Sequence, residues 1–215
     1  FYLGAAMFRR AVRDFLQRHA WGAADWSDLV RAFERAAGRD LQDWAAAWVN
    51  RRGLPNVTLQ WRGGALWLAQ EDALAERGSW PQKLVVAAAG EDGQVRTSET
   101  RLEQRSTRVV GPAAHPAARW LYANAGDFGY GRFLLDEASR QSLLAEPLAL
   151  PDGLLRAQLV EALWESVRDA QLAPAAFIDW AMALAAEEAD DVILAGLLGR
   201  VETAFRRYLS DAQRD

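Results

Sequence analysis

The sequence predicts a multidomain α+β protein that runs from helices through a small antiparallel β-sandwich to a layer of repeat-like helices. Apolar residues recur at steps of three and four before residue 55, alternate with polar residues between 55 and 123, and return to the helical period after 124. Turn residues separate the segments. We therefore expect three units, residues 1–54, 55–123 and 124–215.

Composition narrows the classes of function. The 215 residues are 51% hydrophobic and 25% charged, as in globular proteins. The formal charge of −4 gives no overall basic surface for phosphates, so we expect no nucleic-acid partner. The chain has no cysteine, which excludes thiolate nucleophiles and sulfur-ligated metal sites.

The sequence shows no membrane or export signal. No run approaches the roughly 18 apolar residues of a spanning helix, and the amino end lacks a basic segment followed by an apolar stretch. We expect no membrane partner and a cytoplasmic location. The chain opens at Phe1 inside an apparent helix, so we expect a longer protein to precede it.

The first unit predicts three short helices. The first extends from Leu3 to Ala20. Asp25 and Asp28 form a capping-box pattern before the second helix, which Gly38 ends. Asp40 and Asp43 repeat the capping pattern at the start of the third helix. Gly53 and Pro55 end that helix.

The middle unit predicts a sandwich of short strands. Apolar and polar residues alternate from Val57 to Arg62, and Ala65 to Leu68 follow Gly63-Gly64 as a return strand, which indicates a hairpin. Four further strand candidates are Trp80–Ala88, Gln94–Leu102, Thr107–Val110 and Arg119–Tyr122. Their number and spacing are typical of a small antiparallel sandwich.

The last unit predicts helices from Asn124 to the end. Acidic residues or a proline stand at each expected start. The expected helices are Asp136–Leu144, Asp152–Val167, Pro174–Leu184 and Asp190–Leu209. Four helices in antiparallel pairs suggest a helical-repeat layer. If that layer continues in a longer protein, we expect an exposed apolar edge.

No motif in the sequence predicts a catalytic, cofactor-binding or metal-binding residue in this chain. A zinc site needs several imidazoles or carboxylates at one point, often two histidines one helical turn apart. The only histidines, His19 and His115, lie in different segments, so we expect structural roles for both. No G-x-S-x-G motif is present.

Glycine clusters and carboxylate pairs could be read as functional sites, but a structural role explains each of them. The glycine clusters Gly90 to Gly93 and Gly126 to Gly131 lack the context of a phosphate loop, so we expect turns. The carboxylate pairs Glu187-Glu188 and Asp190-Asp191 stand at a helix junction, where capping and solvation are expected.

The ten tryptophans could stack against sugars or bases, but their positions favour packing. Trp44 and Trp48 share a helix face, and Trp61 and Trp67 lie in facing strands. We expect most tryptophans in the core or between units, and one or two to be exposed.

Three stretches resemble the aminopeptidase N family of zinc metallopeptidases. Residues 2–22, YLGAAMFRRAVRDFLQRHAWG, resemble the family's helix ending in Y/F-L-x-x-H-A-W/Y-G-N-A-T. Ala23 replaces the usual Asn, and Asp25 replaces the usual Thr while keeping a capping side chain. Residues 28–41 resemble D-L-x-x-x-x-E-x-A-S-G-R-D-L, and residues 124–133 resemble N-A-x-x-x-G-Y-x-R-V.

The resemblance implies that residues 1–54 are the helical end of a thermolysin-like catalytic domain, 55–123 a β-sandwich domain, and 124–215 the start of a C-terminal α-helical domain. The family's H-E-x-x-H, G-x-M-E-N and Y-x-K-G motifs are absent from this chain. The implied zinc would therefore have its ligands elsewhere in the parent protein. The implied partners are the upstream catalytic domain and the peptide substrates of the parent enzyme.

These observations favour a non-catalytic portion of a zinc-dependent aminopeptidase that shapes substrate access and is inactive alone. The alternative is a non-catalytic module whose helical layer binds a protein or peptide. An unrelated globular domain with chance similarity is the third hypothesis.

Overall fold

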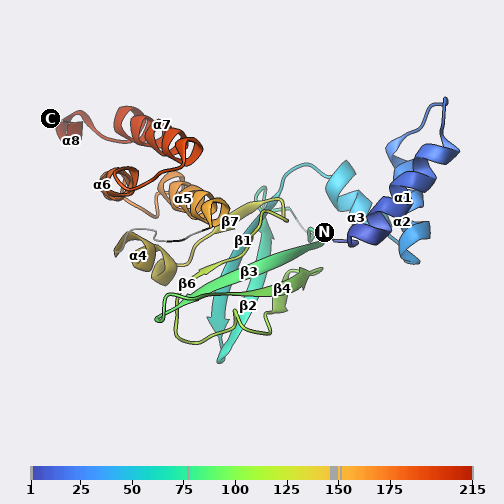
Figure 1. The fold of residues 1–215 in the computed structure, drawn as a ribbon, viewed down its shortest axis with the longest axis horizontal. Helices are drawn as coiled ribbons and strands as arrows, with labels where there is room; N and C mark the ends of the chain where they lie inside the picture. The colour runs from blue at the N-terminus through green and yellow to red at the C-terminus, as the bar shows by residue number, and fades with distance from the viewer. Residues whose placement is uncertain (1, 77, 146–149, 151, 215) are drawn as a thin grey trace.

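A computed structural model describes residues 2–76, 78–145, 150 and 152–214. The chain is α+β, with small sheets between two groups of helices. Figure 1 shows the amino-terminal helices at one end, the strands in the middle and the carboxy-terminal helices at the other end.

The amino-terminal group holds α1 (Ala5–Arg18), α2 (Trp26–Ala37), α3 (Gln42–Ala45) and the π-helical segment η1 (Ala46–Asn50). The predicted capping box is confirmed, since Asp25 accepts the Asp28 N–H and Asp28 accepts the Asp25 N–H. Gly38 ends α2 in the left-handed region, with φ of 63°. The helices share a small core of Ala11, Val30, Phe33, Leu41 and Ala45.

The predicted third helix differs from the structure. The capping box expected from Asp40 and Asp43 is wrong, because Leu41 occupies the cap position and its N–H donates to Glu34 at 3.0 Å. Asp40 accepts only the neighbouring N–H of Gln42, at 2.7 Å. The helix also widens into the η1 turn, which no sequence pattern indicated.

The strands form two sheets with the orders β5-β2-β1-β7 and β4-β3-β6. Their bounds are β1 Pro55–Arg62, β2 Ala65–Asp72, β3 Gln82–Gly90, β4 Val95–Leu102, β5 Ser106–Arg108, β6 Ala118–Tyr122 and β7 Arg132–Leu134. The β1–β2 hairpin is confirmed, with Gly63 and Gly64 both at positive φ, 56° and 74°, as a type I′ turn requires.

Strand β7 corrects two expectations. Residues 132–134 were expected among helices, but they pair with β1 in parallel, so the sheets are not wholly antiparallel. Three residues are too short to show a twofold pattern, and their partner strand lies far away in the sequence.

Strand β3 is buried on both faces and joins the sheets to the helices. Leu84, Val86 and Ala88 point into the core between the two sheets. Ala87 and Ala89 point the other way, into a core shared with helices α4 to α7. The β-strands and the carboxy-terminal helices therefore do not have independent cores.

The carboxy-terminal group begins where the sequence predicts. Its helices are α4 (Glu137–Ala145), α5 (Gly153–Arg168), α6 (Pro174–Ala185) and α7 (Asp191–Arg207), followed by the short α8 (Asp211–Arg214). Asp136, Asp152 and Asp190 each accept a first-turn N–H, and Pro174 opens α6. The division into units 1–54, 55–123 and 124–215 stays a prediction.

Arg51 links the amino-terminal helices to the sheets. Its guanidinium lies 4.7 Å from the centre of the Trp80 ring and pairs with the buried carboxylate of Asp72. Beside it, the indole N–H of Trp48 donates to the Pro81 carbonyl at 2.8 Å. The Trp48 ring also meets the Trp80 ring edge-on.

Arg132 provides the corresponding link to the carboxy-terminal helices. From β7 its guanidinium donates to Glu165 at 2.7 Å and to Asp169 at 2.5 Å, both at the end of α5. A third donor reaches Asn56 of β1 at 3.4 Å. One side chain thus joins two strands and a helix.

The sandwich core provides a stability test. Leu84→Ala should lower the free energy of unfolding by about 2–5 kcal/mol, because Leu84 is fully buried and its truncation leaves a cavity. Chemical denaturation measures this change. Val110→Ala, at a 66% exposed position, is the control and should change stability by less than about 0.5 kcal/mol. Equal effects of the two substitutions would contradict the assigned core.

Candidate docking surface

The two histidines have structural positions. His19 ends α1, where its backbone N–H donates to the Phe15 carbonyl and its ring packs against the Phe15 ring at 5.1 Å. Its Nε2 lies 3.9 Å from Asp28. His115 is exposed in the turn before β6, and its carbonyl accepts the Ala118 N–H. The loop position expected for His115 is confirmed, and structural roles for both residues stay a prediction.

The described residues do not fit a zinc site. Across residues 2–76, 78–145, 150 and 152–214, no three histidine or carboxylate side chains come together to hold a metal ion. His19 and His115 belong to separate parts of the fold. No catalytic step can therefore be assigned to a metal held by these side chains.

The carboxylates before α7 divide into two roles. Asp190 caps α7, as expected, by accepting the N–H groups of Val192 and Ile193. The expectation of a solvated Glu188 is wrong, because its side chain is 2% exposed and accepts two hydrogen bonds from Arg156, at 2.9 and 3.0 Å. These bonds lower the pKa of Glu188 below its ordinary value.

Both glycine clusters are turns, as predicted. The first closes the β3–β4 hairpin, where Gly90 N–H donates to the Gln94 carbonyl. The second is held by Asn124, whose side-chain oxygen accepts the Gly129 N–H at 2.7 Å.

The tryptophans are less buried than expected. Trp80, Trp120, Trp164 and Trp180 are buried. Three are exposed rather than one or two: Trp21, Trp26 and Trp61. Two of these three lie in the amino-terminal helical group.

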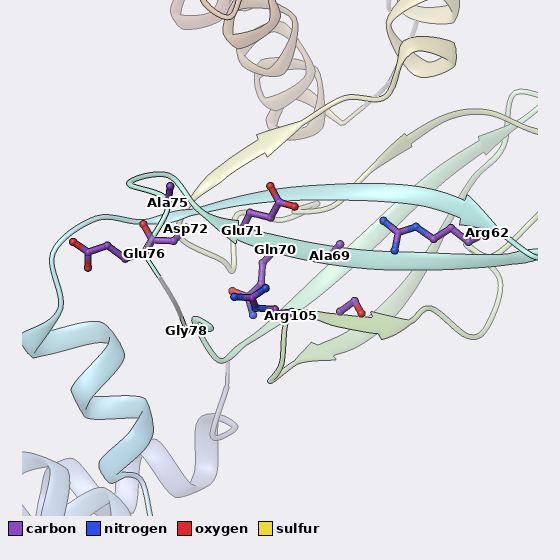
Figure 2. Close-up of a pocket in the computed structure, with 10 residues that line it drawn as sticks. Arg62, Ala69, Gln70, Glu71, Asp72, Ala75, Glu76, Gly78 and Arg105 are labelled. Atoms are coloured by element: carbon purple, nitrogen blue, oxygen red, sulfur yellow. The ribbon is translucent and has the colours of Figure 1, made fainter.

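A hollow of about 340 Å³ lies beside β2, the loop after it and Arg105. Figure 2 shows the residues that line it. Arginine and carboxylate side chains surround it. Gln70 has no free amide group there, since it donates to the Gln104 carbonyl and accepts the Trp80 N–H. Ser106 is the only hydroxyl among the described lining residues, which include no histidine to activate it. The hollow therefore provides no basis for nucleophilic catalysis.

The strongest candidate surface is an apolar face of α1, the α1 stripe, formed by Phe8, Val12, Phe15 and Leu16. Their spacing of four, three and one residues places them on one side of the helix. Phe8 is 53% and Leu16 61% exposed. Helix α2 covers only part of the apolar surface, through Ala11 and the stacking of Phe33 on Phe8.

Two exposed tryptophans follow the α1 stripe in the sequence, one in the loop after α1 and one at the start of α2. Trp21 is fully exposed and has φ of 62°, an uncommon conformation for a bulky residue. Trp26, the first residue of α2, is 43% exposed. Exposed aromatic side chains beside an apolar helix face are typical of interaction surfaces.

The α1 stripe has a basic flank. Arg9 and Arg13 are four residues apart, and Leu16 comes three residues later. This helical spacing places both arginines beside the exposed end of the stripe. Both are exposed, and neither has an ion-pair partner among the residues that the structure describes. A partner that covers the stripe would place carboxylates opposite them.

A second apolar stripe lies on α7. Leu194, Leu198, Val201 and Phe205 recur at steps of four and three. Leu198 is 45% and Phe205 44% exposed. Val201 packs against the core, so the exposed apolar surface of this face is formed by Leu198 and Phe205.

Sequence periodicity identified α1 and α7 as amphipathic but did not identify their exposed faces. The sequence signal that could have identified the exposed face of α1 is the width of its apolar arc. It extends from Met7 to Leu16 around the helix, wider than one neighbouring helix covers.

Comparison with known proteins gives one consistent result. Residues 120–215 match the family described as ERAP1-like C-terminal domain. Over its whole length the chain is 26% identical to aminopeptidase N of Streptomyces lividans, of which it covers 27%. It is 24% identical to aminopeptidase M1-C of Oryza sativa subsp. japonica over 71% of the chain and 19% of that relative.

A third relative is the tricorn protease-interacting factor F2 of Thermoplasma volcanium, 24% identical over 67% of the chain and 17% of the relative. The chain thus spans about a quarter or less of the length of these relatives. The resemblance inferred from the three sequence stretches is confirmed. No helix of the described residues is long and apolar enough to cross a membrane.

The exposure of the α1 stripe can be tested with an apolar dye. The double substitution Leu16→Gln and Trp21→Gln should lower the fluorescence of bound anilinonaphthalene sulfonate and change stability by less than about 0.5 kcal/mol, because both side chains lie at the surface. Val110→Gln is the control. Unchanged dye binding with a large loss of stability would show that the stripe packs internally.

The Arg156–Glu188 pair predicts a pH dependence. Because folding lowers the pKa of Glu188, the pair stabilises the fold fully above the ordinary value of 4.5. That stability is lost as pH falls through the lower pKa of the folded state. Glu188→Gln should reduce stability at pH 7, and its difference from wild type should shrink as pH falls from 5 towards about 3.

The control for this measurement is Glu187→Gln, whose side chain is exposed. It should follow the wild-type stability curve over the same pH range. A constant difference between Glu188→Gln and wild type at every pH would contradict the ionic role of Glu188.

Proposed function

We propose that this chain is a non-catalytic portion of a zinc-dependent aminopeptidase, because residues 120–215 match the ERAP1-like C-terminal domain and the chain resembles aminopeptidases over most or all of its length. The longer enzyme would hydrolyse residues from the amino termini of peptides. The observation that carries this proposal is similarity to an aminopeptidase N along the whole chain.

The α1 surface supports a specific arrangement in the longer protein. Residues 1–54 form the helical end of a thermolysin-like catalytic domain, and the preceding part of that domain covers the α1 stripe. The relatives supply the argument, because this chain covers only a small share of each of them and leaves ample chain to provide such a partner. Arg9 and Arg13 would meet carboxylates of that partner.

The β-sandwich and the carboxy-terminal helices have fixed positions relative to the covered α1 stripe in this arrangement. The sandwich is a spacer, and the carboxy-terminal helices form a wall that limits peptide access to the active site. Support comes from the Arg51 and Arg132 links and from the core that β3 shares with the helices. The zinc ligands and the groups acting on the peptide bond lie outside this chain in this proposal.

Hydrolysis of an aminoacyl p-nitroanilide tests the proposal. We expect activity from the longest protein that the gene encodes, with loss on zinc removal and recovery on zinc addition. We expect none from this chain alone. Activity of the chain itself would overturn the proposal, and inactivity of both proteins would favour a non-catalytic module.

The α1 contact can be tested separately in the longer protein. Leu16→Glu should lower its melting temperature and its activity, because a charge would be buried at the contact. Val110→Glu, equally exposed in this chain but outside the α1 surface, is the matched control. If Leu16→Glu behaves like the control, the α1 stripe is not covered.

The alternative function is a helical module that binds a protein or peptide. The α7 stripe favours it, because Leu198 and Phe205 leave an apolar face available for a partner. A cytoplasmic location and the absence of nucleic-acid and membrane partners stay predictions from composition.

A further inference from the structure

A hollow of about 360 Å³ lies where the strands meet the carboxy-terminal helices. Strand β7 and helix α5 lie side by side at this junction (Figure 1). The hollow is lined by Leu54, Tyr122, Gly131, Arg132, Phe133, Glu161, Ala162, Glu165 and Arg168. Its volume falls at the small end of the range for ligand pockets.

Tyr122 is the unusual residue of this hollow. It is only 6% exposed and packs edge-on against Phe133, with ring centres 6.3 Å apart. Among the described residues its hydroxyl makes no hydrogen bond, and it is not one of the fully buried unpaired atoms, so it remains accessible at the wall of the hollow. Burial, together with the charges of Asp127 and Glu161, raises its pKa, so the phenol is protonated at neutral pH.

A tyrosine hydroxyl at the wall of a hollow gives a mainly apolar ring a polar end that a ligand can reach. Within the hollow Tyr122 can donate one hydrogen bond and accept another. A ligand that supplies these bonds would replace the solvent that reaches the hydroxyl.

Two charged groups on α5 also have free hydrogen-bonding atoms. Glu161 uses one carboxylate oxygen to bind Arg200 and keeps the other free. Arg168 donates through one nitrogen to Glu165, and its Nε and second terminal nitrogen make no hydrogen bond within the described chain. Arg132, by contrast, uses all three of its nitrogens.

These groups are arranged along one side of α5. Residues 161, 165 and 168 are four and three positions apart, so they face the same way. Seven residues of helix span roughly 10 Å, which separates the negative group from the positive one. The paired arginines and glutamates leave the lining without net charge, which disfavours a polyanion or a polycation.

We propose that this hollow binds a small zwitterion, a dipeptide. Glu161 and the Tyr122 hydroxyl bind its ammonium group, and Arg168 binds its carboxylate. The apolar side chain of the ligand packs against Leu54, Phe133 and Ala162. This site is separate from the α1 surface and does not depend on the proposed enzyme activity.

Calorimetric titration of the chain tests the proposal with three probes. Leucyl-leucine should bind with millimolar or tighter affinity. N-acetyl-leucyl-leucine lacks the ammonium and leucyl-leucinamide lacks the carboxylate, so each should bind at least tenfold more weakly. Equal binding of the three probes, or no binding of leucyl-leucine at 10 mM, would overturn the proposal.

Substitutions in the hollow test which side chains contact the ligand. Tyr122→Phe should weaken leucyl-leucine about tenfold while preserving the circular dichroism spectrum, because the ring remains. Arg168→Gln should weaken leucyl-leucine about tenfold and leave leucyl-leucinamide unchanged. Tyr130→Phe, at a 67% exposed position outside the hollow, is the matched control and should bind like wild type. A wild-type affinity for leucyl-leucine in both Tyr122→Phe and Arg168→Gln would place any binding elsewhere.

Discussion

The two-sided burial of β3 is the constraint on which the rest of the structure depends. Successive side chains of a strand point to opposite faces, so Leu84 and Val86 fill the sandwich while Ala87 and Ala89 meet the helices. The alanines leave space on the helix side for Trp120 and Tyr122 of β6, which belong to the same core. The carboxy-terminal helices cannot detach from the sheets without exposing this face to water.

Two arginines join the sheets to the helices on either side of them. Arg51 joins the amino-terminal helices to the sheets through Trp80 and Asp72. Arg132 joins β1 and β7 to α5. A planar guanidinium with several fixed donors suits this role, because one side chain can contact groups from several elements at once. A surface such as the α1 stripe is then held in a defined position relative to α7.

Local patterns gave most of the fold. The caps at Asp25, Asp136, Asp152 and Asp190 and the Gly63-Gly64 turn depend on neighbours a few residues away, which the sequence shows directly. Long-range features did not follow from the sequence. Strand β7 needs β1 as its partner, and the buried pair of Arg156 and Glu188 joins residues 32 positions apart.

The candidate surfaces show the same limit. Periodicity marks the α1 stripe as apolar, but whether α2 covers it depends on how the two helices pack. The hollow beside Tyr122 is assembled from β6, β7 and α5, which no local motif connects. The sequence could therefore indicate which family the chain resembles, while the surfaces required the folded structure.

The central claim is that the sheets and the carboxy-terminal helices act as one unit. Amide hydrogen exchange of the wild-type chain and of Leu84→Ala tests it most directly. If the claim holds, weakening the sandwich core should reduce the protection of the α5 amides from Leu159 to Leu163 as much as that of the β3 amides. Unchanged protection in α5 beside reduced protection in β3 would show two independent units and would contradict the account.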